Sequence, residues 1–204
     1  MKKTIWIPML IGLVFGLLNF MSWAIDLVIP MGVSSSGVQV TAGLYEIFNV
    51  LSAAIGGPIS MVITEIINEI GAYIFFYRPG SNGAVPGYIM SLVSALIHVF
   101  SLLSVIFCYR FFYHRAKNTP ALVSGWLLTI FIYFGLASVI FLGLLKFLNP
   151  DINITFVSFF LDSWPEALVT LIITTLALLA LPKRFRRPVW YEAKSKNQPV
   201  SEEA

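Results

Sequence analysis

Apolar stretches long enough to cross a lipid bilayer take up most of this 204-residue chain. Only 11% of its residues are charged, against about 25% in an average soluble domain. A spanning helix needs about 20 apolar residues, so the chain has room for five or six such helices and for no sizeable soluble domain. A hydropathy window separates six stretches: Ile5–Ile29, Val38–Ala54, Ile59–Tyr77, Pro86–Tyr109, Ala121–Leu145 and Ile154–Leu181. We therefore expect an all-α membrane protein with six transmembrane helices.

The chain divides into a membrane domain and a short tail. Residues 1–182 are expected to form the six-helix transmembrane domain, and residues 183–204 a basic, disordered cytoplasmic tail. The first apolar run is too long for the core of a signal peptide, so we expect it to be retained as the first helix. Between the second and third stretches, Gly56-Gly57-Pro58 predicts a tight turn and hence a helical hairpin.

Basic residues indicate the orientation in the membrane. Arg78 and Lys146 flank the spans on one side, and all other flanking lysines and arginines lie on the opposite side. By the positive-inside rule, the second side is cytoplasmic, with both termini, and the loops 30–37, 78–87 and 146–153 face outward. We therefore expect a multi-pass protein of the cell membrane. The formal net charge of +3 comes from residues that topology explains, so nucleic acid is not an expected partner.

Acidic side chains interrupt the apolar stretches. Glu65 and Glu69, like Asp162 and Glu166, are four positions apart and so share one face of a helix. A charge near the bilayer centre costs about 2.5–3.5 kcal/mol on insertion scales, so such residues usually face a cavity or a partner. These pairs are therefore the strongest indication of a functional site.

Depth along the helices places these groups in one layer. At about 1.5 Å per residue, the acids lie roughly 12–18 Å below the outer surface, with His98 at a similar depth. The layer contains no lysine or arginine, so either its ligand is cationic or several of the acids are protonated. We expect an outward-facing polar cavity in which Trp164 stacks on a flat or cationic ligand. The expected substrate-binding residues are Glu46, Asn49, Glu65, Asn68, Glu69, His98, Asp162, Trp164 and Glu166. The alternative is that protonated acids hydrogen-bond between helices and only hold the bundle together.

Two further observations concern helix packing and chemistry. Gly12 and Gly16 form a small-residue face that permits close approach of another helix, in this chain or in a partner. The chain has no phosphate-binding Gly-x-x-x-x-Gly-Lys motif, no His-Glu-x-x-His zinc motif and no Gly-x-Ser-x-Gly elbow. With one cysteine, Cys108, and two histidines, a metal centre is not expected either. We expect no enzyme activity and no cofactor.

The predicted topology resembles that of the S components, the substrate-capture membrane subunits of energy-coupling-factor (ECF) transporters. The local resemblance lies in Ile55-Gly56-Gly57-Pro58-Ile59-Ser60 and in Ile67-Asn68-Glu69-Ile70-Gly71. Members of that family often carry a Gly-Pro turn and, further on, an aspartate followed by a small residue. Here Glu69 takes the aspartate position and Gly71 the small one, whereas Met61-Val62-Ile63-Thr64-Glu65 replaces a segment that is often glycine-containing in the family.

The resemblance implies capture of a vitamin-like nutrient from outside and its uptake through a complex with a scaffold membrane subunit and two ATPase subunits. In that family, small residues of the first helix contact the scaffold, which gives Gly12 and Gly16 a candidate role. A thiamine-like or other small cationic nutrient fits the acids and Trp164. Two other functions stay open: a stand-alone ion- or proton-coupled carrier that uses the carboxylates as a relay, and a non-transporting assembly or sensory subunit.

Overall fold

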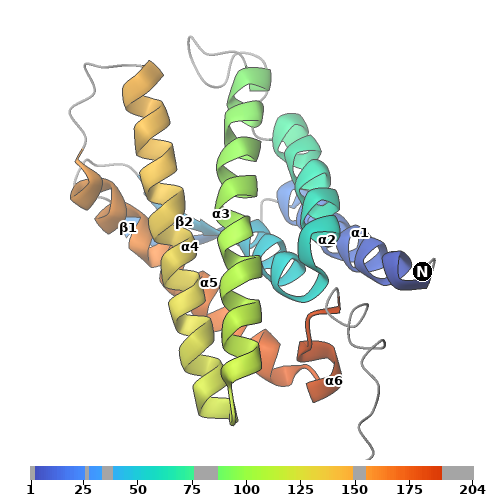
Figure 1. Cartoon of the computed structure of the whole chain (residues 1–204). Coiled ribbons are helices and arrows are strands. Elements are labelled where there is room, and N and C mark those ends of the chain that lie inside the picture. The colour runs from blue at the N-terminus through green and yellow to red at the C-terminus, as the bar shows by residue number, and fades with distance from the viewer. Residues whose placement is uncertain (1–2, 26–27, 34–38, 76–86, 149–154, 190–204) are drawn as a thin grey trace, which may run out of the picture.

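The computed structural model in Figure 1 describes residues 3–25, 28–33, 39–75, 87–148 and 155–189. Its helices are α1 (Lys3–Ala24), α2 (Tyr45–Phe75), α3 (Gly87–Arg115), α4 (Thr119–Leu148), α5 (Phe156–Ala180) and the short α6 (Lys183–Arg186). Two strands, β1 (Val28–Val33) and β2 (Gln39–Gly43), lie between α1 and α2. Within these residues, α1 to α4 are long and apolar enough to cross a membrane, and α5 contains a shorter apolar segment, Trp164–Ala180. The predicted helical membrane fold is thus confirmed in outline.

Helix α2 reverses direction at Gly57. This residue has φ 70° and ψ −158°, a backbone conformation that is essentially restricted to glycine, and Pro58 follows it. Ser52 Oγ lies 2.6 Å from Thr64 Oγ1 although they are 12 residues apart in sequence; a straight helix would separate them by about 18 Å. The two arms of α2, residues 45–56 and 58–75, therefore lie side by side as the hairpin that Gly56-Gly57-Pro58 predicts.

The boundaries of the first two predicted helices are wrong. The chain leaves α1 at Ala24, and β1 pairs with β2 in an antiparallel sheet with an irregular register at Pro30. Valine, isoleucine and threonine favour the extended strand, and proline at position 30 lacks the N–H group that a helix interior uses. As a result the first arm of α2 is about 18 Å long, less than the roughly 30 Å of a bilayer core, so six full spans are not confirmed.

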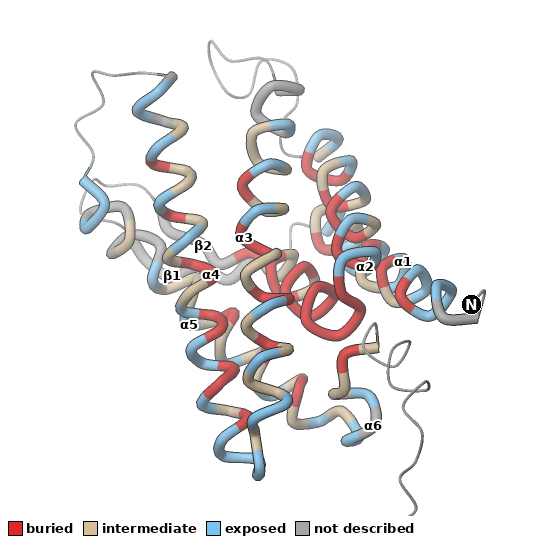
Figure 2. Tube along the Cα trace, viewed as in Figure 1, coloured by how far each residue is buried: buried red, intermediate tan, exposed pale blue. Residues whose placement is uncertain are grey.

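The helices form a closed bundle around α2. Helix α2 contacts α1, α3 and α5, while α4 packs between α3 and α5, and α5 also contacts β2. Figure 2 shows the buried positions along the faces that the helices turn toward one another, with exposed positions outside. Large apolar side chains such as Trp6, Leu10, Phe107 and Phe131 are exposed on those outer faces, as expected for surfaces that contact lipid rather than water.

The expected disordered tail starts with ordered structure. Helix α6 covers Lys183–Arg186, and the Tyr109 hydroxyl of α3 donates to the carbonyl of Arg186 at 2.6 Å. Arg186 in turn donates to the carbonyls of Leu181 and Leu179 at the end of α5. These bonds attach the first residues after α5 to the bundle, while residues 190–204 lie outside the described part.

Candidate functional site

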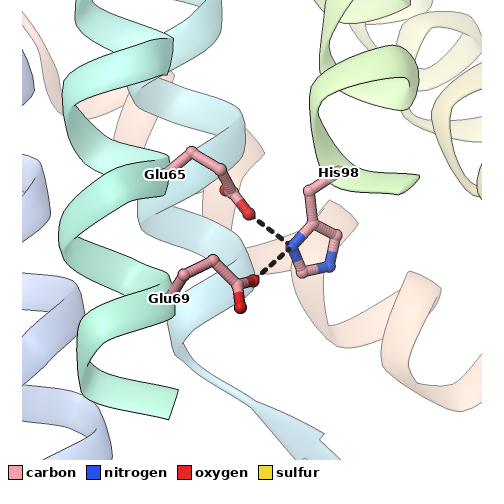
Figure 3. Close-up of side chains that lie close together, drawn as sticks. All are labelled: Glu65, Glu69 and His98. Carbon is pink, nitrogen blue, oxygen red and sulfur yellow. Dashed lines mark hydrogen bonds and ion pairs between the residues drawn. The ribbon is translucent and has the colours of Figure 1, made fainter. Parts of the chain in front are cut away.

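His98 lies at the centre of the acidic cluster. His98 belongs to α3, and its Nδ1 atom lies 2.8 Å from Oε1 of Glu65 and 3.8 Å from Oε1 of Glu69. Figure 3 shows these three side chains pointing toward one another between α2 and α3. On the other edge of the imidazole ring, Nε2 lies 4.0 Å from Oε2 of Glu46. One imidazole thus contacts three carboxylates from both arms of α2.

The hairpin of α2 produces this convergence. Glu65 and Glu69 lie one helical turn apart on the second arm and present their carboxylates on one face. Glu46 lies near the start of the first arm, which Gly57 folds back against the second. The side chains of Glu65 and Glu69 are only 3% and 12% exposed, and that of His98 is 18% exposed. The cluster is therefore almost fully shielded by the bundle.

Buried amides and a tyrosine hold Glu46 in place. The Tyr133 hydroxyl, from α4, donates a hydrogen bond to Oε1 of Glu46. Asn49 Nδ2 lies 3.5 Å from Oε2 of the same carboxylate, and Asn19 of α1 donates to Oδ1 of Asn49 at 2.7 Å. Glu46 therefore has donors on both of its oxygens, and Asn49 acts by positioning it.

Glu65 has a smaller set of donors. Asn68 Nδ2 lies 3.4 Å from its Oε1 atom, and Trp23 Nε1 fixes Asn68 through a 2.8 Å bond to Oδ1. The second oxygen of Glu65, Oε2, is buried and has no hydrogen-bond partner among the described residues. A carboxylate offers about four acceptor positions, and an unpaired buried charged group costs more than about 1–3 kcal/mol. Glu65 Oε2 therefore lacks a donor that a buried carboxylate oxygen requires.

A cavity of about 180 Å³ joins the fourth acid to the cluster. Glu46, His98 and Glu166 line it together with aromatic and small residues of α2, α3 and α4: Tyr45, Ile97, Phe134, Ala137, Ser138 and Phe141. Helix α5, which carries Glu166, also contacts β2. Pockets for drug-sized ligands usually measure about 300–1,000 Å³. The described walls therefore suit an ion or a solute of a few atoms better than a thiamine-like molecule.

Some predicted site residues do not join the cluster. Trp164 is 50% exposed and lines an apolar groove between α4 and α5 together with Phe131 and Phe160. Positions 164 and 166 differ by about 200° around a helix, so Trp164 and Glu166 face opposite ways. Trp164 is therefore not placed beside the acids. The side chain of Asp162 lies outside the described residues.

Gly12 and Gly16 face α2 of the same chain. A Cβ atom on Gly12 would lie 2.8 Å from the Ser60 carbonyl oxygen, and one on Gly16 would lie 2.6 Å from Cδ1 of Ile67. The small-residue face thus does permit close approach, but the helix that uses it is the second arm of α2. A scaffold subunit has no access to this face in the described fold.

Sequence reasoning missed Tyr133 and Asn19. Both are fully buried, and both lie within apolar stretches rather than at their ends. Tyrosine in membrane helices is enriched at the two interfaces, so its position in the middle of Ala121–Leu145 was the available signal. Asn19 gave a similar signal as an amide inside the first stretch.

Comparisons of the chain with protein-family models, with curated proteins and with solved structures found no match, so the chemistry of these side chains is the guide to what the site binds.

Proposed function

We propose that this protein is a membrane subunit that captures a small cation from outside the cell for uptake. The observation that supports this most strongly is the convergence of Glu46, Glu65 and Glu69 on His98 inside an apolar bundle. The ion pairs that the described residues give to Glu46 and Glu65 are both with this one histidine. Even a protonated imidazole balances only one carboxylate, so Glu46 and Glu65, when both are ionised, carry more negative charge than their ion pairs with His98 neutralise.

A purely structural role explains only part of the cluster. Acids that join helices need a donor for each buried oxygen, because an unpaired polar group in the hydrocarbon region is costly. Glu46 meets this requirement through Tyr133 and Asn49. Glu65 does not, since its Oε2 atom has no donor among the described residues. A bound cation would supply the missing partner.

The proposal includes an ECF-type arrangement in which this chain acts as the S component. The absence of a phosphate-binding motif from the sequence fits a subunit that leaves ATP hydrolysis to two partner ATPases. In the orientation that the basic residues predict, both termini are cytoplasmic, and the proposal requires that the site be reached from the outside. Because α2 covers Gly12 and Gly16, a scaffold subunit would contact the exposed apolar face of α1, which carries Trp6, Leu10 and Leu17.

Equilibrium binding by the purified chain in lipid nanodiscs tests the proposal. The panel consists of Na⁺, Mg²⁺, Zn²⁺, Co²⁺ and small organic ammonium ions. We expect saturable binding of one of them, and we expect Glu65→Gln to weaken it at least about tenfold because a charge-assisted ligand is lost. The matched control, Glu192→Gln in the C-terminal tail, is expected to bind like the wild type. No saturable binding, or equal binding by wild type and Glu65→Gln, would contradict the proposal.

Uptake into liposomes separates the subunit from a stand-alone carrier. A capture subunit needs its partners, so this chain alone is expected to bind its cation without accumulating it in the liposome lumen. Uptake by this chain alone, driven by a proton or sodium gradient, would favour the carrier instead.

A further inference from the structure

We infer that Glu65, Glu69 and His98 bind a divalent first-row transition metal ion of the Zn²⁺ type, and that this ion is the captured cation. The inference rests on the proposed function and specifies its cargo. No metal site is expected from the sequence, because it contains one cysteine and two histidines. His98 joins Glu65 and Glu69 from another helix, α3.

The three side chains are spaced as metal ligands. One ligand atom from each lies within 4.8 Å of the other two. In a tetrahedral zinc site with bonds of about 2.0–2.2 Å, ligand atoms lie roughly 3.3–3.6 Å apart. The distances from His98 Nδ1 to the two glutamate oxygens, 2.8 and 3.8 Å, fall on either side of that range. Small side-chain movements would therefore be enough to hold an ion.

The unpartnered oxygen of Glu65 supports a ligand at this place independently of the spacing. Oε2 is buried without a hydrogen-bond donor among the described residues, and the side chain that carries it is 3% exposed. Figure 3 shows the carboxylate of Glu65 directed toward His98. The Glu65 oxygen that lies 2.8 Å from His98 Nδ1 is Oε1, so a metal ion at this place would bind Oε1 and balance the negative charge that the two oxygens of the carboxylate share.

The ligand types select the class of ion. Calcium and magnesium prefer oxygen ligands only, whereas imidazole nitrogen suits zinc, copper, iron and nickel. Two carboxylates and a neutral imidazole carry a charge of about −2, which a divalent ion neutralises; neutrality matters in a low-dielectric interior. Three protein ligands leave a fourth position for water, whereas structural zinc sites are closed by four protein ligands.

Glu46 completes the site from the other side of the imidazole. Binding of a metal through Nδ1 leaves the ring proton on Nε2, which faces Oε2 of Glu46 at 4.0 Å. Metal-bound histidines usually donate their second nitrogen to a carboxylate, which orients the ring and raises its basicity. Tyr133 holds Glu46 in position through its hydroxyl. Glu46 and Tyr133 are thus positioning residues for the metal ligand His98.

Cobalt titration of the metal-free protein in nanodiscs tests the inference, because Co²⁺ reports its ligands through its visible absorption. We expect one Co²⁺ per chain, a four-coordinate spectrum, and displacement by Zn²⁺ but not by excess Mg²⁺. Glu65→Gln, Glu69→Gln and His98→Gln are each expected to weaken Co²⁺ binding by more than about 100-fold. Glu46→Gln is expected to weaken it about 10–100-fold, as for other residues that support a ligand.

The other histidine provides the control. His114 lies at the end of α3, outside the cluster, so His114→Gln is expected to keep the Co²⁺ affinity and spectrum of the wild type. Loss of Co²⁺ binding in His114→Gln with retention in a folded His98→Gln would overturn the inference. Displacement by Mg²⁺ in the wild type would also overturn it, whether or not any variant folds. If the protein bound an organic ammonium ion or Na⁺ saturably but bound neither Co²⁺ nor Zn²⁺, the metal site would be overturned and the proposed function would stand. If it bound no cation of the panel, both would be overturned.

Discussion

Tyr133 gives one acid of the cluster, Glu46, a hydrogen-bond donor that the others do not receive from it. Tyr133 is fully buried at the centre of α4, and its hydroxyl donates a hydrogen bond to Glu46. Glu46 also faces His98 and Asn49, so its carboxylate is fixed before any ligand arrives. Glu65 lacks a comparable donor on Oε2 among the described residues. Two acids on the same helical hairpin therefore differ in their hydrogen-bond donors, and in the proposed site Glu46 supports while Glu65 binds.

Removing that donor is expected to destabilise the fold. Tyr133→Phe keeps the ring and leaves Glu46 without its hydroxyl donor, which should lower the free energy of unfolding by about 1–3 kcal/mol. Thermal or SDS-induced unfolding in mixed micelles measures the change. Tyr113→Phe, on α3 and half-buried near the C-terminal end of that helix, is the matched control and should change stability less. Equal stability of Tyr133→Phe and the wild type would contradict the assigned hydrogen bond.

At the scale of elements, the turn at Gly57 determines the site because it sets the two arms of α2 side by side. With φ 70° and ψ −158°, Gly57 adopts a conformation that costs other residues about 1–3 kcal/mol. Gly57→Ala is therefore expected to lower stability by that amount and to weaken cation binding, as measured by thermal unfolding and by the binding assay. Gly135→Ala in α4, where a Cβ atom would meet nothing within 4 Å, should be neutral or slightly stabilising. A neutral Gly57→Ala would show that the reversal does not depend on this backbone conformation.

The contact between α1 and α2 gives a ranked prediction. A methyl group on Gly12 would meet backbone and Cβ atoms, at 2.8 Å from the Ser60 oxygen and 2.9 Å from the Ile63 Cβ. On Gly16 it would meet Ile67, starting with the flexible Cδ1 end of that side chain. Overpacking of this kind costs about 1–3 kcal/mol, and we expect Gly12→Ala to be the more destabilising of the two in thermal unfolding. If Gly16→Ala were the more destabilising variant, the described packing of α1 against α2 would be contradicted.

Element boundaries also show what local sequence could and could not predict. The turn residues Gly56-Gly57-Pro58 predicted the hairpin, because their conformational demands are local. Hydropathy alone could not separate the strands Val28–Val33 and Gln39–Gly43 from the neighbouring helices, since strands of valine and isoleucine are as apolar as membrane helices. The pairing of β1 with β2 is a contact between two separate segments, and a hydropathy window, which averages over one segment, carries no information about such a contact.

At the scale of the whole molecule, the site depends on how separate helices meet. The spacing of Glu65 and Glu69 was visible in the sequence, but their convergence with His98 needs the packing of α3 on α2, and Glu166 needs α5 to contact α2 and β2. The composition was sufficient to predict a membrane protein, because the apolar content of a chain determines whether it is stable in a bilayer or in water. The helical period already separates Trp164 from Glu166, so the position of Trp164 on the outer groove could have been predicted from sequence.

Unfolding with and without cation tests most directly whether the cluster is a cation site. The wild type and the double variant Glu65→Gln/Glu69→Gln are compared in nanodiscs, with Zn²⁺ added at about 100 times its dissociation constant. Binding to the folded state at that concentration stabilises it by about 2.7 kcal/mol, so the unfolding temperature of the wild type should rise. The double variant should be at least as stable as the wild type without the ion, because it no longer buries two neighbouring carboxylates, and it should not respond to Zn²⁺. An equal response in both proteins, or no response of the wild type to Zn²⁺ or to any other cation of the panel, would contradict the assignment of this cluster as a cation-binding site.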